Sequence, residues 1–284
     1  MNIHRISAFS SDGAGGNPAG VVLLDTPVSE TSMARVAAEV GYSETAFAVP
    51  LGDGVETWRV RYFSPASEVP FCGHATIALG AVLGARFGAG TYRLTLNDAE
   101  ITVEATPDEA GMAATLTSPP THSRAATEAE QGDALALFGL TPADLDDRLP
   151  PARIHAGADH VLLALKDRAA LASTSYDLDA GRRMMDGHGL VTIMLVHADD
   201  AQTFAARNAF ASGGVVEDPA TGAAAAAFAG YLRDQGWPHH GRITIHQGEE
   251  MGAPSVLEIT LGEDIGSPVE VSGRAYEIEE DAAL

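Results

Sequence analysis

The segment FCGHATIALGAVLG, residues 71–84, predicts a helix whose turns from Ala75 onward are apolar on every face. A helix without a polar face cannot lie on a protein surface, so other elements must surround it. A second segment, DPATGAAAAAFAGYL at 218–232, has the same character, and its Ala220 matches Ala75 at an offset of 145 residues (220 − 75). The two segments indicate that the chain is an internal duplication.

The flanking sequence repeats as well. Each half predicts two strands, a helix, two strands, the apolar helix and three more strands. The segments at 57–63 and 202–210 alternate, the segment at 30–40 is an amphipathic helix, and a helical stretch lies at about 179–185. Many strands around one apolar helix favour a curled sheet. We therefore expect an α+β fold of two pseudo-symmetric domains, each a mostly antiparallel sheet around a central apolar helix.

A stretch rich in Pro, Ser and Thr separates the two halves at about 117–151. This joint predicts an N-terminal domain at 1–118 and a C-terminal domain at 119–284, with the final strand free to return to the first domain. Within the joint, Thr127 and Glu130 have the spacing of a capping box and predict a helix start.

Composition excludes several classes of partner. The formal net charge of −22 over 284 residues repels nucleic acid and anionic membranes. Cys72 is the single cysteine, so an intramolecular disulfide and a multi-thiolate metal site are excluded, and the histidines show no metal-site spacing. No apolar run has the length of a signal peptide core or a membrane span. We expect a cytoplasmic protein without metal, nucleic acid or membrane partner.

Polar residues stand at the start of both apolar helices, where unpaired backbone N–H groups favour an anion. If both starts face a cleft between the domains, a small carboxylate could bind there. Cys72-Gly73-His74 in the first half corresponds to Glu217-Asp218-Pro219 in the second, which excludes racemase chemistry with two thiols. His74 and Asp218 fit a functional role and a structural capping role equally well, whereas Cys72 alone is more typical of packing.

Glu44, in GYSETAFAV, precedes a predicted strand on which Ala46 and Ala48 share its face, leaving room above a carboxylate. Its counterpart in the second half falls near Leu190 or Val191, so only one half carries an acid. Composition alone favours an ordinary surface glutamate.

The glycine-rich segment GAGGNPAG at 13–20 is followed by a strand, whereas a dinucleotide-binding loop must open a helix. No cofactor is predicted there, and Asn17-Pro18 fits a tight turn.

Five segments together resemble the PhzF-like family, named for the phenazine-biosynthesis isomerase. They are GNPAGVVL near the start, SETAF at 43–47, FSPASEVPFCGHATIALG at 63–80, EDPATGAAA at 217–225 and HQGEEMGAPS at 246–255. The resemblance implies the diaminopimelate epimerase-like fold, with an active site between two similar domains, no metal or organic cofactor, and a homodimer.

The resemblance also implies residue roles. Glu44 would be the acid/base that moves the proton, and His74 and Asp218 its catalytic partners. Contacts to the substrate would come from a second set: Asn17, Ser43, Gly73, Thr221 and Gly222.

Two positions depart from the family pattern. Ala223 stands where serine is common, which bears on the substrate pocket, and Ala253 stands where arginine is common. The leading hypothesis is a cofactor-independent isomerase that moves a proton on a small carboxylate. An amino-acid or hydroxy-acid racemase or epimerase, and a binding protein without catalysis, are the alternatives.

Overall fold

The computed structural model describes residues 1–11, 13–52, 54–97, 99–108 and 111–278. The chain divides into two compact units, and we call residues 1–117 with 272–284 the first unit and residues 118–271 the second unit. The last strand therefore groups with the first unit from Ser272 onward. Residues 279–284, which the sequence assigned to the C-terminal domain, lie outside the described residues.

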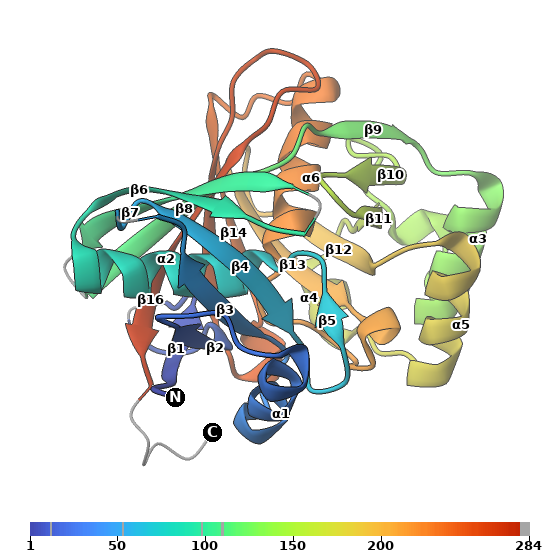
Figure 1. The fold of residues 1–284 in the computed structure, drawn as a ribbon. Coiled ribbons are helices and arrows are strands. Elements are labelled where there is room, and N and C mark those ends of the chain that lie inside the picture. Colours follow the sequence, from blue (N-terminus) through green and yellow to red (C-terminus); the bar gives the residue numbers. More distant parts are fainter. Residues whose placement is uncertain (12, 53, 98, 109–110, 279–284) are drawn as a thin grey trace. The chain divides into compact units, whose positions relative to one another are not determined.

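The first unit is a sheet with two helices (Figure 1). Its elements are β1 (His4–Ala8), β2 (Asn17–Leu23), α1 (Glu30–Val40), β3 (Thr45–Pro50), β4 (Thr57–Phe63), β5 (Glu68–Val69), α2 (Gly73–Phe87), β6 (Gly90–Thr95), β7 (Glu100–Asp108), β8 (Gly111–Thr117) and the larger part of β16 (Glu270–Glu277). The strand order is β16-β1-β2-β3-β4-β6-β7-β8, β5 pairs with β4, and β8 again borders β16. The sheet thus closes on itself.

Helix α2 lies at the centre of this sheet and contacts β1, β2, β3, β6, β7 and β8 (Figure 1). Its residues from His74 to Gly84 are all buried, as the apolar pattern predicted. Gly80 and Gly84 let the strands approach closely, because a Cβ atom at Gly80 would lie 2.5 Å from Val103 Cγ2 and one at Gly84 would lie 2.6 Å from Ala105 Cβ.

The second unit also consists of a sheet with a buried apolar helix packed on it. Its elements are β9 (His122–Ala125), α3 (Glu128–Phe138), η1 (Pro142–Asp144), β10 (Ala152–His155), β11 (Asp159–Ala164), α4 (Arg168–Ser173), α5 (Leu178–His188), β12 (Thr192–Ala198), β13 (Thr203–Ala209), η2 (Ala211–Gly213), α6 (Gly222–Asp234), β14 (Arg242–Gln247), η3 (Glu249–Met251) and β15 (Ser255–Thr260). The strand order is β15-β14-β13-β12-β11-β10-β9.

Helix α6 packs on one face of this sheet and contacts β9, β10, β11 and β15. Its residues from Ala224 to Arg233 are buried. The other face carries α3, α4 and α5, whose Leu135, Leu171 and Met185 pack in one apolar cluster with strand residues such as Ile193. The two predicted central helices are therefore the most buried helices of their units, and they fix where the polar residues at their starts lie.

The helix start predicted within the joint at 117–151 is confirmed, because the Thr127–Glu130 capping box closes the start of α3. The joint also holds β9, which pairs with β10 and was not predicted. One local expectation was wrong. Asn17-Pro18 is not a turn: Asn17 is buried and begins β2 opposite Ala8.

Candidate active site

Glu44 and His74 meet in the first unit. Glu44 directly precedes β3, and its carbonyl oxygen accepts a hydrogen bond from the N–H of Gly20 on the parallel strand β2. His74 is the second residue of α2. The distance between Glu44 Oε2 and His74 Nε2 is 3.3 Å, and the two side chains are 13% and 7% exposed. A carboxylate and an imidazole at this distance and this degree of burial can share and move a proton.

Cys72 completes the cluster. The thiol of Cys72 donates to Glu44 Oε2 over 3.5 Å, and the Sγ atom lies 3.4 Å from His74 Nδ1. Cys72 is buried, as expected for a packing residue, but its sulfur touches both polar partners. This polar contact was not predicted from the sequence. Its one signal was the position of Cys72 next to the start of α2.

The other first-unit residues lie around the same helix start. Ser43 is exposed, and its Oγ atom lies 3.3 Å from His74 Nε2. Gly73 is the first residue of α2, so its N–H is among the groups that helix geometry leaves without an intrahelical partner. Asn17 begins β2, three residues before Gly20. Glu44, Ser43, Gly73 and His74 are thus brought together in one place.

In the second unit, Asp218 and Thr221 form the turn that leads into α6. The hydroxyl of Thr221 donates a short hydrogen bond to Asp218 Oδ2, Thr221 is the N-cap residue, and Gly222 is the first helical residue. Ala223 follows and is partly exposed. The carboxylate of the neighbouring Glu217 instead forms an ion pair with Arg207 Nη2 at 2.6 Å.

Gln247 holds this turn in place and was not singled out from the sequence. Its Nε2 donates to the backbone oxygen of Asp218 at 2.6 Å and to Thr221 Oγ1 at 3.2 Å, while its Oε1 accepts from the N–H of Thr221 at 3.3 Å. Gly248 has a φ of +79°, and a Cβ there would lie 2.8 Å from the oxygen of Pro219. The signal in the sequence was the segment HQGEEMGAPS, which supported the family resemblance but gave no role for its glutamine.

Two groups among the described residues bring three possible metal ligands within 4.8 Å of one another: Glu44, Cys72 and His74, and, in the second unit, His122, His155 and Asp159. In the second group the two imidazole rings are stacked, with their centroids 4.3 Å apart, and Asp159 is already paired with Arg153. The predicted absence of metal rested on spacing along the chain, which does not register ligands that folding brings together. It stays a prediction.

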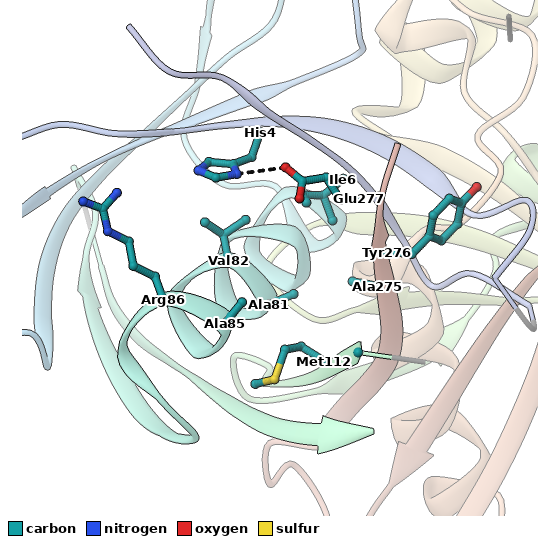
Figure 2. Close-up of a pocket in the computed structure, with 11 residues that line it drawn as sticks. His4, Ile6, Ala81, Val82, Ala85, Arg86, Met112, Ala275, Tyr276 and Glu277 are labelled. Atoms are coloured by element: carbon teal, nitrogen blue, oxygen red, sulfur yellow. Dashed lines mark hydrogen bonds and ion pairs between the residues drawn. The ribbon is translucent and has the colours of Figure 1, made fainter. Parts of the chain in front are cut away.

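A cavity of about 530 Å³ in the first unit contains none of the predicted site residues (Figure 2). It lies beside the second half of α2, at Ala81, Val82 and Arg86, and the bonded pair of His4 and Glu277 stands at its edge (Figure 2). Its separation from Gly73 and His74 leaves the start of α2 as the candidate site.

Comparison with known proteins gives the family. The family model described as phenazine biosynthesis-like protein matches residues 6–281. The chain belongs to this family. The resemblance inferred from the five sequence segments is confirmed.

Three relatives define the similarity. The chain is 32% identical over 265 residues to an uncharacterized isomerase of Deinococcus radiodurans, covering 90% of this chain and 85% of the relative. It is 31% identical over 301 residues to the trans-2,3-dihydro-3-hydroxyanthranilate isomerase of Pseudomonas aeruginosa, covering 99% of each chain. The crystal structure of a PhzF-family phenazine biosynthesis protein from Bacillus anthracis superposes with a TM-score of 0.84 at 21% identity and 98% coverage of both chains.

These relatives confirm that the chain is an isomerase. Within the part of the chain that the structure describes, every helix is too short or too polar to cross a membrane.

Proposed function

We propose that the protein is a cofactor-independent isomerase that moves a proton between two carbons of a small, unsaturated carboxylate. Glu44 is the acid/base, and His74 controls its proton. The single observation that carries this proposal is the contact of 3.3 Å between Glu44 Oε2 and His74 Nε2 at the start of a buried helix.

The reaction needs no external electron donor or acceptor. The Glu44 carboxylate takes a proton from one carbon, and the electron pair of that C–H bond enters the conjugated system of the substrate. The protonated Glu44 then returns the proton to a second carbon, so one C–H bond breaks and one forms. The neighbouring imidazole of His74 supports both states of the carboxyl group by accepting or donating a hydrogen bond.

The negative charge of such a substrate needs a partner, and the chain as a whole is acidic. We assign this role to backbone N–H groups at the start of α2, near Gly73, and at the start of α6, near Gly222. Ser43, Asn17 and Thr221 add polar contacts to the substrate. The proposal requires that Asp218, held by Thr221 and Gln247, binds the same substrate as Glu44.

The fold proposed for this function is the diaminopimelate epimerase-like fold. It is supported by the repeated order of elements and by a buried central helix in each unit. The predicted homodimer and cytoplasmic location stay predictions.

The test compares Glu44→Gln with the wild type on trans-2,3-dihydro-3-hydroxyanthranilate and on related unsaturated carboxylates. Calorimetry measures binding and proton NMR measures turnover. We expect Glu44→Gln to bind a compound that the wild type converts and to convert it at least about 10²-fold more slowly. Equal turnover would contradict the role of Glu44. Inversion at a single carbon would instead favour the racemase or epimerase alternative.

A further inference from the structure

We propose that the cavity beside the second half of α2 binds an alkyl monocarboxylate, with the alkyl chain inside the cavity and the carboxylate on Arg86. The cavity has a volume of about 530 Å³, within the range of about 300–1,000 Å³ that is typical of small-molecule sites. All of its lining residues belong to the first unit. The inference does not depend on the proposed function.

The wall of the cavity is largely aliphatic. One side comes from the second half of α2, and the other comes from β1, β8 and β16 (Figure 2). The ring of Tyr276 is turned away from α2, and its hydroxyl donates to the backbone oxygen of Gly15 (Figure 2). A wall of this kind offers an alkyl chain apolar contact but offers a planar ring little to stack on. The aliphatic lining residues are Ile6, Ala81, Val82, Ala85, Met112 and Ala275.

Met112 lets the cavity adapt to the length of the chain. Its methyl group packs on α2 at Gly84, where a Cβ atom would collide with it. The methionine side chain is unbranched and changes rotamer at low cost. Its movement can therefore admit a longer chain without moving the helix.

Arg86 supplies a positive charge at the edge of the cavity. Its guanidinium lies 5.4 Å from the centroid of the Phe87 ring, and it forms no ion pair with a carboxylate of the described residues. A guanidinium binds a carboxylate through two parallel hydrogen bonds. Because the chain carries a net charge of −22, an anion needs such a local cation to be held.

The pair of His4 and Glu277 restricts the ligand to one negative charge. His4 Nδ1 lies 3.0 Å from Glu277 Oε1 at the edge of the same cavity. A second carboxylate on the ligand would be repelled by Glu277, and a ligand ammonium would be repelled by Arg86. A monocarboxylate with an uncharged chain avoids both repulsions.

The cavity is separate from the candidate active site. Arg86 follows His74 by 12 residues on α2 (86 − 74), which corresponds to about 18 Å along the helix axis. An alkyl carboxylate held at Arg86 therefore does not reach Glu44 or His74. Its binding should be independent of both residues.

The experiment titrates the full-length protein with sodium octanoate in a calorimeter. We expect one equivalent to bind. Hexanoate lacks two methylene groups and should bind about tenfold more weakly, and uncharged 1-octanol should bind at least about tenfold more weakly. Equal affinities for hexanoate and octanoate would contradict an alkyl chain inside the cavity.

Arg86→Gln should weaken octanoate binding by at least about tenfold. Arg93→Gln is the matched control, because Arg93 is an exposed arginine of β6 in the same unit and does not line the cavity. The control should bind octanoate within about twofold of the wild type. Circular dichroism shows that each variant is folded.

Wild-type protein that binds no octanoate, or Arg86→Gln that binds it as tightly as the wild type, would overturn the proposal. Glu44→Gln should bind octanoate as the wild type does. Loss of binding in Glu44→Gln together with normal binding in Arg86→Gln would place octanoate in the candidate active site instead. Absence of binding together with a changed oligomeric state of Arg86→Gln in sedimentation would assign this face to a subunit contact.

These outcomes are distinguishable from a failure of the isomerase proposal. Turnover measured without octanoate should be the same within about twofold in Arg86→Gln and the wild type, because Arg86 is remote from the candidate active site. The calorimetric results therefore decide the cavity alone.

Discussion

Glu44 Oε2 lies 3.3 Å from His74 Nε2, although the two residues are 30 positions apart (74 − 44) and belong to different elements. The carboxylate comes from the residue before β3 and the imidazole from the first turn of α2. Because α2 is buried by an apolar sequence, the position of this pair is a direct consequence of how the core of the first unit packs.

Replacing His74 tests whether the pair acts as a unit. We expect His74→Gln to lower kcat by about 10²-fold or more, because Glu44 loses the imidazole that exchanges its proton. His4→Gln is a matched control, since His4 forms another such pair with Glu277 at 3.0 Å in the same unit. The control should keep kcat within about twofold. Equal losses in both variants, measured by steady-state kinetics, would contradict the role of His74.

Replacing Gln247 by Glu tests whether Gln247 holds the turn between Asp218 and Thr221 in place. Glu at this position would place an oxygen against the carbonyl of Asp218, which costs about 1–3 kcal/mol and predicts roughly ten- to hundredfold lower kcat/KM. Gln202→Glu is the control, because Gln202 also donates to two backbone carbonyls, those of His239 and Arg242, in the same unit. If both variants lose thermal stability equally and Gln247→Glu keeps full kcat/KM, Gln247 has no positioning role.

Gly80 tests the close packing around α2. Gly80→Ala would place a methyl group 2.5 Å from Val103 Cγ2, and we expect a net loss of about 1–3 kcal/mol in the free energy of unfolding. Gly132→Ala in α3 has open space around it and should instead stabilise by up to about 1 kcal/mol through helix propensity. Urea unfolding measures both variants, and effects of the same sign would argue against the packing account.

His160 predicts a pH dependence of stability. The side chain is fully buried, its Nδ1 lies 2.6 Å from Thr192 Oγ1, and burial lowers the pKa of His160 to about 3. Below the ordinary histidine pKa of about 6.5 the unfolded chain binds a proton that the folded chain does not bind. The free energy of unfolding is therefore unaffected by this histidine above about pH 6.5. Below that pH it falls by about 1.4 kcal/mol per pH unit as the pH drops toward 3.

His160→Asn should remove this contribution, so that its free energy of unfolding falls less than that of the wild type between pH 7.5 and 5.5. The difference should be about 1.4 kcal/mol. His240→Asn is the control: His240 is exposed, with a φ of +50° that asparagine tolerates. Parallel pH profiles for the wild type and His160→Asn would show that His160 is not responsible.

The sequence predicted the elements well where one physical requirement dominated. The segments at 73–84 and 218–232 have no polar face, so burial at the centre of a unit was the one packing open to them. The duplication then placed the counterpart of Glu44 near Leu190 or Val191. In the structure Thr45 begins β3 and Thr192 begins β12, so Val191 occupies the corresponding place.

Contacts between side chains were less accessible to sequence reasoning. Cys72 looks like a packing residue, and the sequence assigns no role to Gln247. Their partners are distant in sequence: Glu44 for the thiol, and Asp218 and Thr221 for the amide. Such contacts depend on strand register and on the exact course of a loop, which composition does not encode. The polar joint concealed β9 for the same reason, because its pairing with β10 gives little apolar signal.

The fate of the substrate proton tests the central claim most directly. In D₂O, NMR can follow the wild type and Glu44→Gln on the same unsaturated carboxylate, with trans-2,3-dihydro-3-hydroxyanthranilate as the first compound. The account predicts that the wild type forms a product in which one C–H bond has been lost and another formed at a different carbon, carrying the original proton or solvent deuterium, and that Glu44→Gln forms none. Product formation by Glu44→Gln at the wild-type rate, with the same labelling, would contradict it.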